Sequence, residues 1–159
     1  MDPIQKRLVF IVEDNELYSL MLQYTLSNDT IVQCICFKTG EECIQNIDLN
    51  PMLIILDYWL PGMNGMETFK EIKNKKPEIP VVILTRNEDE KLGKEFIKNG
   101  AYDYLYKEDD SILQVKKIIN SVLDKIMRDE QTESTGAKIL FCILFFIAIS
   151  IVLIYMNRT

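Results

Sequence analysis

The stretch Met52–Gly65 reads MLIILDYWLPGMNG and carries the strongest structural signal in this chain of 159 residues. It opens with an unbroken apolar run, Met52–Leu56, which is typical of a strand buried on both faces of a parallel sheet. Asp57 ends that run, and the turn residues Pro61 and Gly62 follow it. Open α/β sheets bind ligands at the carboxyl ends of their strands. The stretch alone leaves a second interpretation open, in which Asp57 only caps the following turn or helix.

Four more apolar runs predict strands on either side of this one, and helical patterns separate them. The strands are expected at 8–12, 31–37, 81–85 and 102–106, and the helices at about 16–26, 40–47, 65–75, 88–99 and 111–127. Strands that alternate with helices through short connections predict a doubly wound α/β domain with a five-stranded parallel sheet.

Three local features refine these helices. Asn15 can cap the first helix with its side-chain oxygen, and Gly100 suits the left-handed residue that ends the fourth. The residues expected to turn the first helix toward the core are Leu17, Leu20, Met21 and Tyr24.

The end of the chain differs in composition from this body. Residues 1–128 form the predicted domain, 129–137 a polar linker, 138–156 a membrane-spanning helix and 157–159 a short tail. Apart from Ser150, Ile139–Met156 is apolar and uncharged, and as a helix it would span about 27 Å, close to the hydrocarbon thickness of a bilayer. More Lys and Arg on the body side than in the tail predict a single-pass membrane protein with a cytoplasmic body. No output domain is expected after the body.

Composition narrows the classes of partner. A formal net charge of -6 and the lack of a long basic run argue against nucleic acid. The chain has no histidine, which removes the commonest zinc ligand and general base. Its four cysteines form no CxxC pair and are expected to be reduced, structural thiols: Cys34, Cys36, Cys43 and Cys142.

Candidate site residues follow four of the predicted strands, and they should meet at one edge of the sheet. They are Glu13, Asp14, Asp57, Thr85 and Lys107. Crowded carboxylates repel one another unless a cation lies among them, and oxygen ligands without histidine favour Mg²⁺. A hydroxyl and an ammonium suit the oxygens of a phosphoryl group. The set therefore predicts phosphoryl transfer to Asp57, with Mg²⁺ and Lys107 offsetting charge.

Together these motifs make the chain similar to the receiver domain of two-component response regulators. The resemblance covers about residues 8–127 and is carried by VED at 12–14, LDYWLPGMNG at 56–65, LT at 84–85 and GAYDYLYK at 100–107. It implies a flavodoxin-like sheet of order 2-1-3-4-5. It also implies a signalling protein that catalyses its own phosphoryl transfer, with a histidine kinase or histidine phosphotransfer protein as donor and an unknown downstream protein as partner.

The resemblance also assigns roles at the metal and phosphoryl sites. Asp57 corresponds to the phosphoacceptor, Asp14 to the direct Mg²⁺ ligand and Glu13 to a carboxylate acting partly through water. The backbone carbonyl of Trp59 would complete the protein's share of the metal shell.

The resemblance also assigns a switch, made by Thr85 and Tyr104, and a role for Lys107. Thr85 matches the hydroxyl that moves onto the phosphoryl group, and Lys107 the lysine that pairs with it. Tyr104 matches the aromatic residue that turns inward when the threonine moves; a partly buried strand tyrosine is the simpler alternative for it.

Two positions depart from the family pattern. Glu108 follows Lys107 where the family usually has proline, often after a cis peptide bond, so Lys107 is expected to sit differently if this bond is trans. Arg86 follows Thr85 in place of a small residue, and its cation can reach the phosphoryl group or Glu88. Both departures keep an alternative open: a degenerate receiver that acts as a membrane-tethered binding module without phosphorylation.

Other phosphate-handling families fit less well. A phosphatase of the haloacid dehalogenase type needs a second Asp two residues after the first, and Trp59 stands there. The glycine motifs of dinucleotide-binding and P-loop proteins are absent. A membrane-anchored, single-domain response regulator is therefore the function that the sequence predicts.

Overall fold

The structure is a computed structural model that describes the backbone of residues 6–27, 31–86 and 89–156. Within the last helix it leaves out the side chains of residues 133, 134, 137, 138, 142 and 146–156. The chain divides into two units, residues 1–119 and 120–159, and each is described by itself.

A parallel sheet forms the centre of the first unit. Its strands are β1 (Arg7–Val12), β2 (Val32–Phe37), β3 (Leu53–Leu56), β4 (Val81–Thr85) and β5 (Asp103–Tyr106). They pair in parallel in the order β2-β1-β3-β4-β5, which confirms the predicted α/β class and strand order. All four residues of β3 are buried, as its unbroken apolar run predicts.

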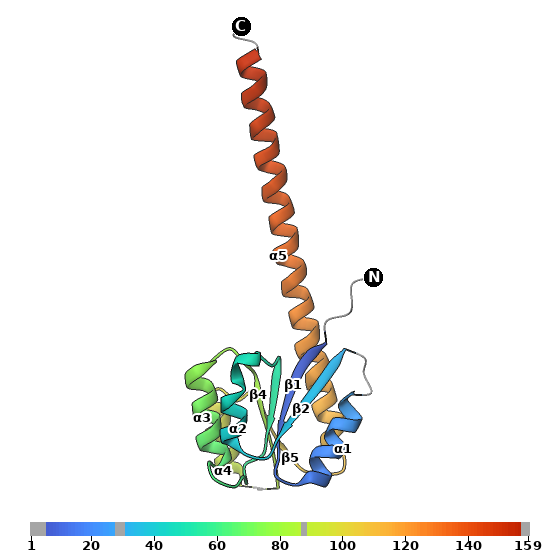
Figure 1. Cartoon of the computed structure of the whole chain (residues 1–159), viewed down its shortest axis with the longest axis vertical. Helices are drawn as coiled ribbons and strands as arrows, with labels where there is room; N and C mark the ends of the chain where they lie inside the picture. The colour runs from blue at the N-terminus through green and yellow to red at the C-terminus, as the bar shows by residue number, and fades with distance from the viewer. Residues whose placement is uncertain (1–5, 28–30, 87–88, 157–159) are drawn as a thin grey trace. The chain divides into compact units, whose positions relative to one another are not determined.

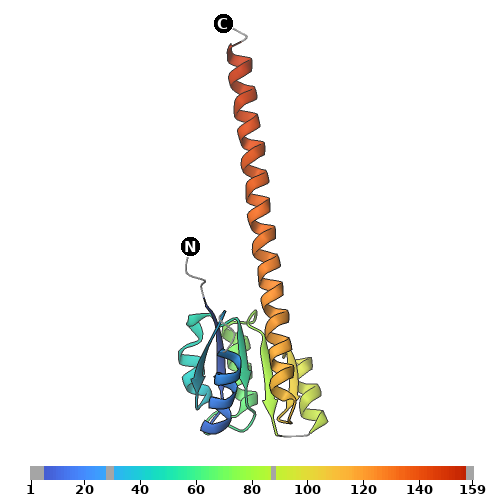
Figure 2. The same ribbon diagram turned by 90° about the vertical axis from the view of Figure 1, so that its right-hand side faces the viewer.

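Helices cover both faces of the sheet. They are α1 (Glu16–Ser27), α2 (Gly40–Gln45), the short 3-10 helix η1 (Ile47–Leu49), α3 (Gly65–Lys75), α4 (Glu90–Lys98) and α5 (Ser111–Met156). Helices α2, α3 and α4 lie on one face of the sheet, and α1 and the first turns of α5 lie on the other (Figures 1 and 2). Right-handed crossovers between parallel strands produce this two-sided arrangement.

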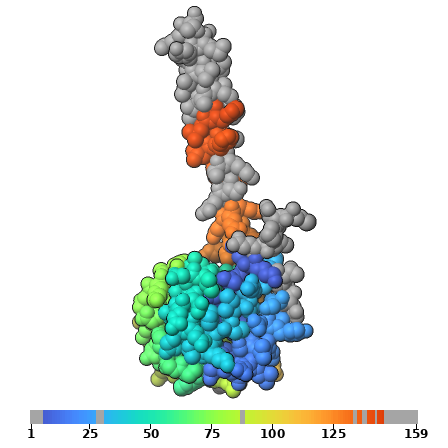
Figure 3. Space-filling model, viewed as in Figure 1, coloured from blue at the N-terminus to red at the C-terminus, as the bar shows by residue number. Residues whose placement is uncertain are grey.

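The first helix turns a different face to the core from the one predicted. The four apolar residues expected inside are exposed: Leu17, Leu20, Met21 and Tyr24. Ser19, Leu22 and Leu26 are buried in their place. The helix carries apolar residues on both faces, so periodicity alone did not choose between them. Figure 3 shows α1, in blue, at the outer surface of the first unit.

The fifth helix also differs from the prediction. Residues 129–137, expected to be a linker between two helices, lie within the continuous helix α5. The segment contains good helix formers and no proline, and its single Gly136 costs a helix only about 1 kcal/mol relative to alanine. Within the part of the chain that the structure describes, no helix is long and apolar enough to cross a membrane. Much of the predicted span, at 142 and 146–156, lies outside the described side chains.

The third helix begins very close to the strand that precedes it. Asn64 and Glu67 form a capping box, each side chain accepting a hydrogen bond from the other's backbone N–H at 3.0 Å. Gly65 starts the helix, and a Cβ added there would lie 2.5 Å from the carbonyl oxygen of Asp57 and from the Cα of Tyr58. Only glycine permits this approach.

Candidate functional site

The predicted site residues meet at the carboxyl edge of the sheet. Glu13 and Asp14 follow β1, Asp57 follows β3, Thr85 ends β4 and Lys107 follows β5. The backbone fixes the acceptor strand against its neighbour, because the Asp57 N–H donates to the Val12 carbonyl at 2.9 Å. On the other side of the site, the Lys107 N–H donates to the Thr85 carbonyl at 2.9 Å. Four strands that are distant in sequence therefore deliver one cluster of side chains.

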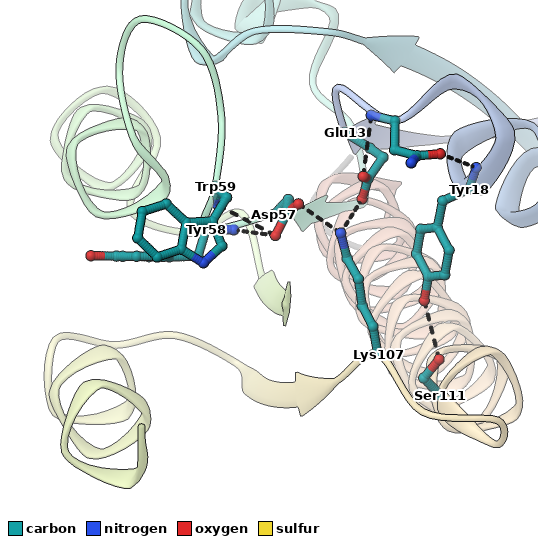
Figure 4. Close-up of polar contacts among 8 residues, drawn as sticks. Glu13, Tyr18, Asp57, Tyr58, Trp59, Lys107 and Ser111 are labelled. Atoms are coloured by element: carbon teal, nitrogen blue, oxygen red, sulfur yellow. Dashed lines mark hydrogen bonds and ion pairs between the residues drawn. The ribbon is translucent and has the colours of Figure 1, made fainter. Parts of the chain in front are cut away.

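Lys107 lies at the centre of this cluster. Its Nζ donates to Asp57 Oδ2 and to Glu13 Oε2, each at 2.6 Å, and the three side chains are between 3% and 6% exposed (Figure 4). No peptide bond among the described residues is cis, so the bond between Lys107 and Glu108 is trans. The lysine reaches the acceptor aspartate nonetheless. A trans bond is thus compatible with a contact between Lys107 and Asp57, and the catalytic role of the lysine stays a prediction.

The acceptor carboxylate is held at both oxygens. The Tyr58 N–H donates to Asp57 Oδ1 at 2.7 Å, and the Trp59 N–H approaches the same oxygen at 3.4 Å. The other oxygen, Oδ2, receives the Lys107 ammonium. Asp57 is 5% exposed, and its contact with Lys107 comes in addition to the amide contacts that the alternative interpretation, a simple cap, would explain. Figure 4 shows Tyr58 and Trp59 extending away from the carboxylate.

Three carboxylates form a group with the spacing of a metal site. One oxygen each from Glu13, Asp14 and Asp57 lies within 4.8 Å of the others. Burial raises the pKa of Glu13, and the hydrogen bond and charge of Lys107 oppose that rise. Three carboxylates against one ammonium leave two negative charges, which a divalent cation would balance. An all-oxygen donor set of this kind fits Mg²⁺.

The cluster opens into a polar pocket. Its lining residues are Glu13, Asp14, Asn15, Asp57, Trp59, Arg86 and Lys107. Arg86 thus stands at the predicted phosphoryl site, whereas Glu88, its other predicted partner, lies outside the described residues. Trp59 lines the pocket and is 61% exposed, and its carbonyl as a metal ligand stays a prediction.

The two predicted switch residues lie on the neighbouring strands β4 and β5, and neither is among the residues that line the pocket. Thr85 is fully buried at the end of β4, and Tyr104 lies half-buried on β5. The Tyr104 ring packs at 5.9 Å from Phe96 and 5.6 Å from Tyr106 between ring centroids. Burial raises the pKa of Tyr104 to about 12, so its hydroxyl is neutral at physiological pH. Its role as a switch stays a prediction.

Comparison with known proteins identifies the family. The model of the response regulator receiver domain matches residues 9–119. The chain belongs to this family. The receiver is 28% identical over 121 residues to the DNA-binding transcriptional regulator NtrC of Escherichia coli K12. The matched region covers 74% of this chain but only 26% of NtrC.

Solved structures agree with the fold of the receiver. The signal receiver domain of a putative LuxO repressor protein from Vibrio parahaemolyticus superposes with a TM-score of 0.72 and 26% identity, covering 80% of this chain and 98% of that one. The Mn²⁺-bound form of the response regulator Rcp1 gives a TM-score of 0.64 and 28% identity, covering 70% and 91%.

Two residues near the site were not predicted from the sequence to belong to it. Tyr18 lies in the first turns of α1 with its ring 4.8 Å from Lys107 Nζ, and its hydroxyl is 3.2 Å from Ser111 Oγ. No motif marks either residue. Only the rotation of α1 against the start of α5 brings them together, and this rotation is the feature that periodicity predicted wrongly.

Proposed function

We propose that this receiver accepts a phosphoryl group on Asp57, in a reaction that depends on Mg²⁺, from a histidine kinase or histidine phosphotransfer protein. One observation carries the proposal: a buried lysine bridges Asp57 and Glu13 beside a three-carboxylate group. A receiver that only bound partners would have no need to bury these charges, because each buried charge costs several kcal/mol unless it is paired. The Mn²⁺-bound form of Rcp1 gives independent support for a divalent cation.

The chemistry follows from the ligands of Asp57. An oxygen of the Asp57 carboxylate attacks the phosphorus of the donor, an O–P bond forms, and the N–P bond to the donor's imidazole breaks. The imidazole nitrogen keeps the electron pair of that bond and takes up a proton from solvent. Mg²⁺, when bound by Glu13, Asp14 and Asp57, supplies positive charge beside the transferring oxygens. The Lys107 ammonium exchanges its contact with the Asp57 carboxylate for one with a phosphoryl oxygen. It therefore has a negatively charged partner before and after the transfer.

The signal is proposed to leave the site through the switch pair. Thr85 and Tyr104 stand on neighbouring strands, in a sheet where Thr85 pairs with Tyr106 and Ile83 with Tyr104. Movement of the Thr85 hydroxyl toward the phosphoryl group would vacate space for the Tyr104 ring. A downstream protein would then recognise the surface of α4 and β5. The acidic net charge supports a protein rather than nucleic acid as this partner.

The carboxyl-terminal sequence supports a membrane-anchored form of the receiver. Residues 139–156 contain no Asp, Glu, Lys or Arg, and hydrophobic stretches of 18 or more residues are typical of membrane spans. We therefore propose a single-pass anchor with the receiver on the cytoplasmic side. In cell fractions, the full chain should stay in the membrane pellet after an alkaline wash, and a version ending at Arg128 should not. Recovery of the full chain in the supernatant would rule the anchor out.

Intact-mass measurement tests the phosphoacceptor directly. We expect the full chain, kept in mild detergent with Mg²⁺ and acetyl phosphate, to gain one phosphoryl group, and the Asp57→Asn variant to gain none. Asp48→Asn is a matched control because that side chain is 90% exposed on η1. Omitting Mg²⁺ should also prevent the adduct.

A phosphorylated histidine phosphotransfer protein serves as a second donor. If neither donor labels the wild-type chain, the receiver does not accept a phosphoryl group. The alternative, a phosphorylation-independent binding module, would then take its place.

A further inference from the structure

A tyrosine contacts the central lysine of the site from outside the carboxylate cluster. The ammonium of Lys107 lies over the Tyr18 ring, 4.8 Å from its centroid, and contacts Asp57 and Glu13 with its hydrogen-bond donors. Figure 4 shows the Lys107 side chain passing between the Tyr18 ring and the acceptor aspartate. A cation over an aromatic face is attracted to the ring, most strongly where water is excluded. The lysine is 4% exposed, so water is largely excluded here.

Tyr18 is itself fixed at both ends. Its backbone N–H donates to Asn15 Oδ1 at 3.0 Å, and the Asn15 N–H approaches Glu13 Oε1 at 3.3 Å. Its hydroxyl lies 3.2 Å from Ser111 Oγ, and Ser111 is 1% exposed at the start of α5. The ring therefore connects the acidic turn after β1 to the first residue of α5, on either side of the lysine.

The loop that carries the lysine needs such support. Glu108 follows Lys107, so no proline restricts the backbone between β5 and α5. The backbone hydrogen bonds of this loop run from Lys107 to Thr85, from Glu108 to Tyr106 and from Ser111 to Glu108. They hold the main chain, whereas the flexible side chain of the lysine is held through its ammonium, at Asp57 and Glu13. Tyr18 adds a restraint that involves no carboxylate, through its ring at the ammonium and its hydroxyl at the end of the loop.

We infer that Tyr18 is a positioning residue for Lys107 in phosphoryl transfer. This inference rests on the proposed function. When the phosphoryl group arrives, Lys107 has to release a carboxylate oxygen and take a phosphoryl oxygen. The Tyr18 ring holds the ammonium during that exchange without offering a competing negative charge, so the lysine stays within reach of Asp57.

A spectroscopic measurement on the full chain tests the contact itself. Protons above an aromatic ring resonate upfield, so the ε protons of Lys107 should be shifted upfield in the wild type and in Tyr18→Phe. They should return to the ordinary lysine position in Tyr18→Leu. Tyr24→Leu is the matched control, because Tyr24 lies on the same helix and is 73% exposed. An ordinary shift in the wild type would overturn the inference without the use of any variant.

Phosphorylation kinetics with acetyl phosphate test the role. We expect Tyr18→Leu to lower the maximal rate about fivefold, the equivalent of losing one partly buried cation–π contact. Tyr18→Phe and Ser111→Ala, which keep the ring but lose the hydroxyl contact, should lower it about twofold. The acetyl phosphate concentration at half-maximal rate and the Mg²⁺ affinity, read from the fluorescence of Trp59, should not change.

The outcomes separate this inference from the function on which it rests. Failure of the wild-type chain to form any adduct contradicts the proposed function. Normal labelling of the wild type, with an unchanged maximal rate in Tyr18→Leu, contradicts only the role of Tyr18. Equal losses in Tyr18→Leu and Tyr18→Phe would show that the ring is not what matters. A parallel loss of Mg²⁺ affinity would assign Tyr18 a purely structural role.

Discussion

Two lysines follow the two edge strands of the sheet, and their environments could hardly differ more. Lys38 comes directly after β2 and Lys107 directly after β5. Lys38 pairs with Glu16 on the surface, where the two side chains are 64% and 72% exposed. Lys107 is 4% exposed and lies between two carboxylates, Glu13 and Asp57, that are 3% and 6% exposed.

The two lysines differ in exposure because the residues around them differ. Beside β2, the pair of Lys38 with Glu16 on α1 lies at the surface, and water surrounds it. Beside β5, the central strands β1 and β3 present Glu13 and Asp57 beneath the loops, where water is excluded. An exposed ion pair adds little to the free energy of unfolding. Removal of one partner from a buried ion pair lowers that free energy strongly, because an unpaired charge stays buried. Loss of a charge should therefore cost the buried cluster far more stability than the surface pair.

Removal of the buried lysine should destabilise the receiver most. Lys107→Ala leaves the charges of Glu13 and Asp57 buried without a cationic partner, and we expect the free energy of unfolding to fall by about 3 kcal/mol. Urea unfolding without Mg²⁺, followed by the fluorescence of Trp59, measures the change. A loss no larger than that of Lys38→Ala would show that the two lysines are equivalent after all.

Mg²⁺ should stabilise the buried cluster and leave the surface pair unaffected. At a concentration 100 times its dissociation constant, a ligand that binds only the folded state raises the free energy of unfolding by about 2.7 kcal/mol. Thermal unfolding with Mg²⁺ or with a chelator should show this rise in the wild type. Asp14→Asn should abolish it and Asp48→Asn should keep it, because Asp48 lies on the exposed surface of η1. Stabilisation of both variants alike would place the cation elsewhere.

Alkaline pH should weaken the body through a buried thiol. Burial raises the pKa of Cys43 from 9.0 to about 12. The unfolded chain loses this proton first, so stability is complete below pH 9 and falls as the pH rises toward 12. We expect the free energy of unfolding at about pH 10 to be about 1 kcal/mol lower than at neutral pH, because of this thiol. Urea titrations at several pH values measure the slope, and Cys36→Ser, at an exposed position, should leave it unchanged.

Removal of Lys38 from the surface pair should have the smallest effect on the free energy of unfolding. Lys38→Ala removes the partner of Glu16 where both groups are solvated, so we expect no measurable change in the free energy of unfolding. The same urea titration serves, in low and in high salt. A clear loss that salt does not reduce would mean that this pair is more than a surface contact.

The sequence predicts the site better than the surfaces of its helices. Asp57 stands after an unbroken apolar run, and a parallel sheet forces the ends of β1, β3, β4 and β5 to one edge. The convergence of Glu13, Asp57 and Lys107 therefore follows from strand order alone, and it is confirmed. Cys34, Cys36 and Cys43 form no disulfide among the described residues, and their reduced state stays a prediction.

Helix orientation could not be predicted in the same way. On α1, both the exposed pair Leu17 and Tyr24 and the buried pair Leu22 and Leu26 have helical spacing. Either pair could have faced the core. Tertiary packing decides between two such faces, and a single sequence does not contain that information. The contact of Tyr18 with Lys107 depends on the same rotation. The continuity of α5 was missed for a different reason, because a polar segment with one glycine resembles a linker as much as a solvated helix.

The close approach of α3 to the acceptor strand has a consequence for variation in this protein. Gly65 has no side chain and is not a candidate site residue, yet a single added methyl group would collide with the backbone at Asp57 and Tyr58. In a saturation mutagenesis screen for signalling, this position should reject every replacement, alanine included. Neighbouring Met66, only partly buried, should accept several. Natural variants at Gly65 would then look like losses of the phosphoacceptor itself, although the acceptor residue had not changed.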